Sequence, residues 1–443
     1  MTRALERLFG KRPSSRGPVI WRLWASGLAL SLILGCAHRA LETEPSSCIP
    51  HFPYAEGWLG GDAAYSVALP KTSPEGSDQR TLWLFGDTFV AQNPAHHNRK
   101  TAKFIHNSIG ISRCTEAGFE IRYHWGQTAE HGAHAFLAPT PAARADAYVW
   151  LFGGFTHKGI LYLGVLDVEP APPQGPLALP FRLTGMQLAR VDHPDQPPDR
   201  WRPTRARLSH SQKAFPGAAM VVHEEHVYFF SFPDDKSSSS SNFLARLPLE
   251  ALDDFPGDLS GQIQTWTRQH QWETGFLPEA ARPIMPDSAS EMSVHFDASE
   301  KTWLALYGIP TGSPPQPGTD QSAQAIATDS VYARSAPRLT GPWSSARDLY
   351  SLPTANEKTA PDGTFCYAAK AHPELSPPDH LVITYVCSLK PTPTRSALET
   401  FSQLQDDLSL YVPQVVVLPW PPESLTPSQS HQTLSTEPGA RTP

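Results

Sequence analysis

The sequence has few charged residues and no excess of positive charge. Asp, Glu, Lys and Arg make up 18% of the 443 residues, and the formal net charge at pH 7 is -7. Nucleic-acid binding needs clustered Lys and Arg to neutralise phosphates, so the composition argues against such a partner. The chain also holds 46 Pro, 29 Gly and 12 Trp, which is typical of a turn-rich, aromatic protein and not of a helical bundle.

Motifs of several common enzyme classes are missing as well. The sequence contains no phosphate-binding glycine loop, no Gly-x-Ser-x-Gly elbow and no catalytic Cys/His pair. It therefore gives no support for nucleotide, esterase or thiol chemistry, and it predicts no cofactor. His131 and His134 have a spacing that a metal accepts, but no clear partner ligands accompany them, so no metal site is predicted.

An apolar run near the N-terminus, residues 23–34, is too short to cross a bilayer. It follows several Lys and Arg residues and ends in Ile33-Leu34-Gly35-Cys36, which resembles a bacterial lipoprotein signal. We expect residues 1–36 to act as this signal, with a lipid on Cys36 anchoring the exported protein to a membrane. Ala37 favours the outer membrane, and an ordinary signal peptide or an uncleaved anchor is the alternative.

Cysteine is scarce, with five in the chain. Once Cys36 is set aside, Cys48, Cys114, Cys366 and Cys387 remain, an even number in an oxidising setting that allows three pairings. Cys366 and Cys387 lie in two strand-like runs joined by a short connection, so antiparallel pairing would place them opposite each other. A Cys48–Cys114 bond then follows by elimination.

Both flanks of the mature chain are poor in apolar residues. Residues 37–56 form a polar tether, and residues 421–443 form a tail rich in Pro, Ser and Thr. Neither segment can bury enough surface to become ordered, so we expect one domain over residues 57–420.

Within that domain one strand-like pattern recurs five times, at intervals of 67 to 79 residues between Trp83, Trp150, Tyr228, Trp303 and Val382. Each copy follows a second such run across a short turn, which indicates hairpins; these runs are Ala64–Leu69, Ala135–Ala138, Ala218–His223, Met292–Phe296 and Cys366–Ala369. Further short strands follow each copy. The pattern predicts an all-β fold, a five-bladed β-propeller with about four antiparallel strands per blade. Residues 170–216 are interpreted as an inserted outer strand or loop of the second blade, with a solvated surface decoration as the alternative.

Carboxylates stand where the blades should meet the mouth of the channel. Alignment of the five repeats places Asp62, His134, Gly217, Glu291 and Cys366 or Tyr367 at the starts of the innermost strands. The second strand returns to the same rim, so we expect Asp87 beside Asp62, and the next strand starts there with His106 and Asn107. Lys370 and His372 are expected to line the channel or to have a structural role.

Such a cluster meets the needs of glycosidic bond cleavage, which takes one carboxylic acid and one carboxylate. We assign Glu291 as the general acid and Asp62 as the base or nucleophile, while Asp87 orients the substrate or raises the pKa of the acid. Residues expected to contact sugar are Trp58, His106, Asn107, His134, Phe155 and Tyr367. In the alternative interpretation Asp62 and Asp87 only cap turns, and the protein is a non-catalytic lipoprotein that binds carbohydrate or another partner.

Several of these runs resemble the DUF4185 domain family over about residues 57–420: Gly61–Val67, Leu82–Phe89, His106–Ser108, Ser290–Val294 and Tyr367–Pro373. That family is similar to five-bladed propeller glycosidases and includes endo-acting D-arabinanases. The resemblance implies a hydrolase that cleaves a furanosidic or related polysaccharide, such as an arabinan. The expected partners are therefore a poly- or oligosaccharide and, through the lipid, a membrane.

Overall fold

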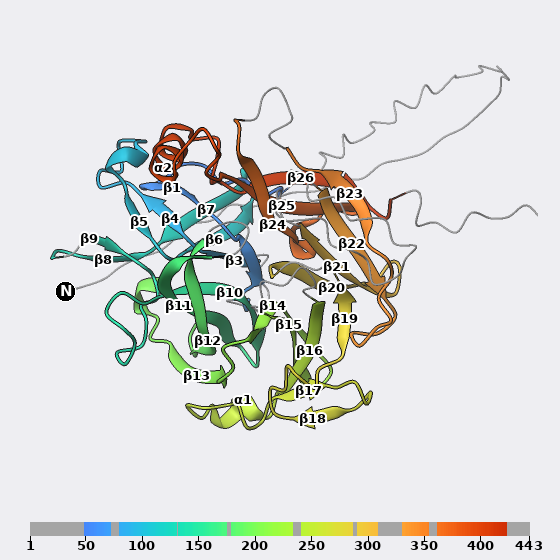
Figure 1. Cartoon of the computed structure of the whole chain (residues 1–443). Coiled ribbons are helices and arrows are strands. Elements are labelled where there is room, and N and C mark those ends of the chain that lie inside the picture. Colours follow the sequence, from blue (N-terminus) through green and yellow to red (C-terminus); the bar gives the residue numbers. More distant parts are fainter. Residues whose placement is uncertain are drawn as a thin grey trace, which may run out of the picture. The chain divides into compact units, whose positions relative to one another are not determined.

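The computed structural model describes residues 48–71, 79–130, 132–174, 179–233, 241–286, 290–308, 330–353 and 361–422. Cys36 and the rest of the predicted signal lie outside the described residues, as do residues 37–47 and 423–443 of the predicted tether and tail. The described part of the chain is built almost entirely from antiparallel β-sheets (Figure 1), so the all-β class is confirmed. Among its helices, none is both long and apolar enough to span a membrane.

Five sheets, each made of strands consecutive or nearly consecutive in sequence, form the body of the described chain. The first contains β2 (Tyr65–Ala68), β3 (Arg80–Phe85), β6 (Ser108–Thr115) and β7 (Gly118–His124), and the second β10 (Tyr148–His157), β11 (Ile160–Gln174), β12 (Leu179–Val191) and β13 (Thr204–Ser209). The third contains β14 (Ala214–His223), β15 (His226–Pro233), β16 (Ser241–Pro248), β17 (Gln264–Trp266), β18 (Trp272–Thr274) and β19 (Pro283–Pro286). The fourth contains β20 (Met292–Asp297), β21 (Thr302–Gly308), β22 (Ser330–Ala336) and β23 (Arg347–Ser351), and the fifth β24 (Thr364–Ala371), β25 (His380–Leu389) and β26 (Gln414–Pro419).

Smaller elements join these sheets. Two short sheets are formed by β1 (Trp58–Gly61), β4 (Thr88–Val90) and β5 (Lys103–Ile105), and by β8 (Gly126–Thr128) and β9 (Gly132–His134). The helices are α1 (Ala251–Asp254), α2 (Ala397–Asp406) and the 3₁₀ turns η1 (Arg99–Thr101), η2 (Pro198–Arg200) and η3 (Pro373–Leu375). Helix α2 begins at a capping box in which the Ser396 hydroxyl and the Glu399 carboxylate each accept a backbone N–H.

The first strands of the five sheets contact one another in sequence order, β2 with β10, β10 with β14, β14 with β20 and β20 with β24. Side-chain hydrogen bonds then join β24 to the segment that leads into β2, because Lys370 Nζ donates to the carbonyl of Ala63. Neighbouring sheets cover both faces of the central strands, so the run Leu82–Phe85 is buried throughout and lacks the alternation of a half-exposed strand.

The second sheet differs from the repeat alignment. The run Val149–Gly153 lies in β10, the first strand of its sheet, whereas the equivalent run Leu82–Phe85 lies in β3, a second strand. Residues 135–138, which were predicted as the first strand, contain no strand. The segment 170–216 completes β11 and supplies β12, β13 and the start of β14, so it provides outer strands of the second sheet and is not a surface decoration.

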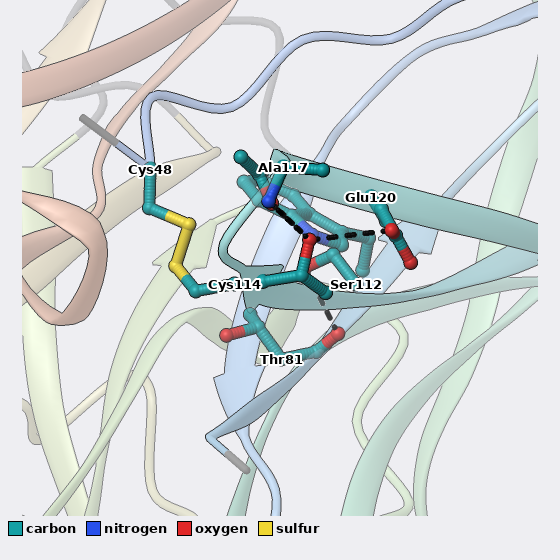
Figure 2. Close-up of a disulfide and its surroundings, with 9 residues drawn as sticks. Cys48, Thr81, Ser112, Cys114, Ala117 and Glu120 are labelled. Carbon is teal, nitrogen blue, oxygen red and sulfur yellow. Dashed lines mark hydrogen bonds between the residues drawn. A yellow bond between two sulfur atoms is a disulfide. The ribbon is translucent and has the colours of Figure 1, made fainter. Parts of the chain in front are cut away.

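Two disulfides form within the described chain, and both pairings are as predicted. Cys366 on β24 lies directly opposite Cys387 on β25. Cys48 is bonded to Cys114 on β6, which holds the segment before β1 against the first sheet (Figure 2).

Candidate active site

Asp62 lies in the sharp turn between β1 and β2. Ala63 and Ala64 both adopt left-handed backbone conformations, with φ of 70° and 53°, and such conformations are strained for residues other than glycine. Two backbone hydrogen bonds join this turn to the residues that follow β3. The Asp62 N–H donates to the carbonyl of Asp87, and the Gly86 N–H donates to the carbonyl of Asp62. The turn therefore fixes Asp62 beside the Gly86-Asp87 pair.

The Asp62 carboxylate is held by aromatic hydroxyl groups. Its Oδ2 accepts hydrogen bonds from Tyr367 Oη at 2.7 Å and from Tyr411 Oη at 3.1 Å. Its Oδ1 lies 2.5 Å from the point where a Cβ on Gly86 would be, so this position has no room for a side chain. None of these contacts caps a turn through the Asp62 side chain.

Asp87 lies at the end of β3, as predicted, and is oriented by two donors. Trp150 Nε1 on β10 and His106 Nδ1 each lie 2.9 Å from Asp87 Oδ1. The Asp87 side chain keeps 19% of its surface exposed, so it remains accessible from solvent.

Glu291, at the start of β20, forms an ion pair with a buried lysine. Lys370 Nζ is 3.2 Å from Glu291 Oε1, and the two side chains are 1% and 17% exposed. The same ammonium donates to the carbonyls of Ala63, at 2.8 Å, and Ala368, at 2.9 Å, and lies over the Tyr65 ring. Lys370 thus connects Glu291 to the strained turn that carries Asp62.

A β-bulge in β24 gives Lys370 and Tyr367 their positions. The register of β24 against β25 shifts between Tyr367 and Lys370, and Ala368 there has a φ of 59°. Bulges redirect side chains and are common beside active sites. This bulge directs the Tyr367 hydroxyl to Asp62 and the Lys370 ammonium to Glu291.

The carboxyl groups of Asp62 and Glu291 have different electrostatic environments. Burial, followed by the charges of Asp87 and Glu291, raises the pKa of Asp62 from 3.8 to about 8, although the two tyrosine hydroxyls oppose the shift. Burial lowers the pKa of Lys370, and the adjacent Glu291, its ion-pair partner, partly offsets this. The raised pKa places the proton on Asp62 at neutral pH, whereas the sequence prediction assigns Glu291 as the general acid.

This raised pKa predicts how stability changes with pH. Between pH 4 and pH 8 the folded protein binds more protons at Asp62 than the unfolded chain does, so the free energy of unfolding should fall as pH rises through this window. Asp62→Asn should remove that dependence and raise the melting temperature at pH 8 by a few degrees. Thermal melts at pH 5 and pH 8 measure this.

The matched control for the melts is Asp258→Asn, because hydrogen bonds from Ser260 lower the pKa of Asp258. A carboxylate with a lowered pKa stabilises the fold above its unfolded pKa, so this control should leave the melting temperature at pH 8 unchanged or lower it. An Asp62→Asn protein that melts below the wild type at pH 8 would contradict the buried-acid assignment.

Four residues predicted to contact sugar lie elsewhere. Trp58 has no exposed surface and stacks on Tyr123 in the core, and Phe155 is 6% exposed and stacks on Tyr162. Asn107 is buried, and its side chain satisfies backbone groups of Leu137 and Val149. The described contacts of His134, on β9, are with Ala135 and Gly126 and not with the carboxylates.

His106 and Tyr367 are the predicted sugar contacts that do join the cluster, each through a carboxylate. The sequence prediction missed Trp150 and Tyr411 as partners of the carboxylates. Trp150 was assigned to a second strand, away from the rim, and Tyr411 lies after α2 in a segment without a motif. A correct alignment of the five repeats would have placed Trp150 near the carboxylates, whereas no feature of the sequence indicated that Tyr411 contacts them.

A cavity of about 230 Å³ is lined by Tyr65 and Lys370, which contact the cluster, but not by Asp62, Asp87 or Glu291 themselves. Each of the five sheets contributes to its wall through its first strand; the wall includes Ser66, Gly154, Met220, Val294 and His372. Lys370 and His372 were expected at such a channel. Among the described residues, no group of three or more His, Cys, Asp or Glu side chains is arranged to hold a metal ion.

The chain matches a known protein family over most of its length. Residues 50–402 match the model of a family described as a domain of unknown function, DUF5005. The chain belongs to the DUF5005 family. This corrects the DUF4185 resemblance drawn from the short motifs, because the family that matches over most of the chain is a different one.

Solved structures also resemble this DUF5005 chain. A candidate hydrolase from Bacteroides ovatus is 18% identical, with a TM-score of 0.57, and the match covers 83% of this chain and 87% of that one, so the two share a fold. An α-L-arabinanase from Cellvibrio cellulosa is 12% identical, with a TM-score of 0.38 and coverage of 81% and 91%. An endo-arabinase from Bacteroides thetaiotaomicron is 9% identical, with a TM-score of 0.39 and coverage of 83% and 97%. The comparison with curated proteins gave no match.

Proposed function

We propose that this protein is a glycoside hydrolase that cleaves a poly- or oligosaccharide at the Asp62, Asp87 and Glu291 cluster. The observation that carries the proposal is that Asp62, Asp87 and Glu291 come together from two different sheets. They lie close enough for the charges of Asp87 and Glu291 to raise the pKa of Asp62, while Glu291 forms an ion pair with Lys370. A carboxyl group that keeps its proton at neutral pH, beside a second carboxyl group, is typical of an acid at an active site. The shared fold with the Bacteroides ovatus candidate hydrolase agrees with this proposal.

In the proposed reaction Asp62 acts as the acid. Its proton passes to the glycosidic oxygen as the bond between that oxygen and the anomeric carbon breaks, and the ionised Glu291 attacks that carbon or activates the water that does so. Water supplies the hydroxyl group that ends on the anomeric carbon. Asp87, held by Trp150 and His106, contributes to the raised pKa of Asp62 and so helps to hold the proton there.

The scaffold proposed for this site is a five-bladed β-propeller. Support comes from the successive contacts among β2, β10, β14, β20 and β24 and from the cavity that all five strands line. The hydrogen bonds from Tyr367 to Asp62 and from Lys370 to Ala63 link the last sheet to the start of the first. In a propeller the innermost strands bring such side chains together at one mouth of the channel.

The direct test is to incubate the purified protein with a panel of polysaccharides that includes arabinans, and to measure new reducing ends. We expect cleavage of at least one of them. Binding without cleavage would instead support the alternative, a carbohydrate-binding module. Absence of both binding and cleavage would contradict a carbohydrate function.

We also propose that the protein is exported and anchored to the cell envelope by a lipid on Cys36, in the outer membrane. The two disulfides support export, because such bonds persist in oxidising compartments. Cys36→Ala, expressed in a bacterial host, should move the protein from the membrane fraction to the soluble fraction. Immunoblots of the two fractions measure this, and unchanged membrane retention would count against lipidation.

A further inference from the structure

Partly exposed aromatic rings form a continuous series of contacts past Asp87. Adjacent ring centroids are 3.8 to 6.2 Å apart, and the order is Phe181, Trp150, Tyr148, His106, Phe104 and Phe401. We call this series the aromatic strip. Its members come from β12, β10, β5, the turn after β5 and α2, and each keeps part of its surface exposed.

The reactive cluster lies at the middle of the aromatic strip and not at its end. Trp150 and His106, both hydrogen-bonded to Asp87, are its inner members. Phe181 lies beyond Trp150 in one direction, and Phe104 and Phe401 lie beyond His106 in the other. A chain bound along the strip would therefore extend past the carboxylates in both directions.

Buried side chains hold the Phe401 end of the strip in place. Phe89, 1% exposed, packs against both Phe104 and Phe401, and Tyr411 packs against Phe104 while its hydroxyl bonds to Asp62. The position of these rings is thus coupled to that of the Asp62 carboxylate.

The same end of the strip exposes apolar surface. Among the described residues, four large hydrophobic side chains are clearly exposed, and two of them are Leu398, at 79%, and Phe401, at 39%. They lie three residues apart on α2 and so share one face of the helix. Exposed apolar side chains grouped beside a polar site mark a binding surface.

We propose that the aromatic strip binds consecutive sugar residues on both sides of the cleaved bond, so that the substrate is the interior of a polysaccharide chain and the enzyme is endo-acting. The inference rests on the proposed function. Sugar rings present C–H faces that pack on aromatic rings, while their hydroxyl groups reach polar partners such as Asp87 and His106. Rings on both sides of the carboxylates favour a substrate that continues in both directions over one that ends at the site.

The test uses Phe401→Ala and Phe181→Ala, one variant for each end of the strip, on a ladder of oligosaccharides from the polysaccharide that the protein cleaves. We expect KM for the longest oligosaccharides to rise about threefold to tenfold in each variant, with a smaller effect as the chain shortens. Wild-type protein should first release oligosaccharides of intermediate length. Phe296→Ala is the matched control, because Phe296 is 50% exposed but packs on Trp303, outside the strip, and it should change neither measurement.

Release of single sugars alone from the earliest times, or variants that match the wild type at every chain length, would overturn the inference. Affinity gels that contain the polysaccharide keep the two proposals distinguishable, because they measure binding without turnover. If the wild type cleaves nothing, the proposed hydrolase function fails. In that case the gels test the aromatic strip alone. Reduced retardation of Phe401→Ala and Phe181→Ala would support sugar binding by the strip, and unchanged retardation would contradict it.

Discussion

Asp62→Asn should lower the rate of polysaccharide cleavage by about 10²–10⁴-fold, the usual contribution of a positioned general acid or base. The amide has nearly the shape of the carboxylic acid and its oxygen can still accept the hydrogen bonds from Tyr367 and Tyr411, but it has no proton to transfer. Aryl glycosides with activated leaving groups depart without protonation, so their hydrolysis should fall much less. Rates on both substrate classes, measured with the same protein preparations, give the comparison.

Glu291→Gln is the partner experiment, because Glu291 is assigned to attack the anomeric carbon or to activate water. Its loss should affect both substrate classes alike, whatever the leaving group. If Glu291→Gln spares aryl glycosides and Asp62→Asn does not, the roles are those predicted from sequence and the pKa-based allocation is wrong. Wild-type rates in both variants would remove the cluster from the reaction altogether.

Arg99→Met should give the largest loss of stability, about 3 kcal/mol or more in the free energy of unfolding. The Arg99 side chain is fully buried, and its guanidinium donates to backbone carbonyls of β1 and of the segment from α2 to Tyr411; these are Leu59, Leu404, Asp407 and Leu410. Methionine fills much of the volume but leaves these carbonyls buried without donors. Because Leu410 precedes Tyr411, the change should also weaken the hydrogen bond to Asp62 and lower activity. Thermal or denaturant unfolding measures the stability.

Lys100→Met is the control for this experiment. Lys100 is the neighbour of Arg99 in the chain, but its ion pair with Asp406 is exposed, with side-chain exposures of 54% and 57%. Such pairs contribute about 0–1 kcal/mol, so the control should unfold close to the wild type. Equal stability of Arg99→Met and Lys100→Met would contradict the role given to Arg99.

The repeated apolar runs allowed the all-β class to be predicted, but not the order of every strand. Leu82–Phe85 and Val149–Phe152 look alike in sequence because the central strands are covered on both faces, and burial on both faces removes the alternation that would distinguish a first from a second strand. In the second repeat, the run Val149–Phe152 was consequently assigned to the second strand of its sheet, although it lies in the first strand, β10. The error also placed His134, instead of the β10 residues Tyr148 and Trp150, at the rim.

The site was predicted where local motifs carry it and missed where it depends on tertiary packing. Asp62 and Asp87 stand in short turn motifs, and their backbone hydrogen bonds bring them together as expected. Trp58 and Phe155 were chosen because aromatic rings often stack on sugars, yet the same ring types fill cores, and only packing distinguishes the two uses. Tyr411 reaches Asp62 across 349 residues of sequence, a contact that no local pattern indicates.

Hydrolysis of a glycosidic bond by the carboxyl cluster is measured most directly as the release of reducing ends. The proteins compared are the wild type and the Asp62→Asn/Glu291→Gln double variant. Both proteins are assayed on the same polysaccharide, and thermal melts confirm that both are folded. We expect steady release by the wild type and no release above background by the folded double variant. Equal release by the two proteins, or no release by the wild type from any polysaccharide tested, would contradict hydrolysis by this cluster.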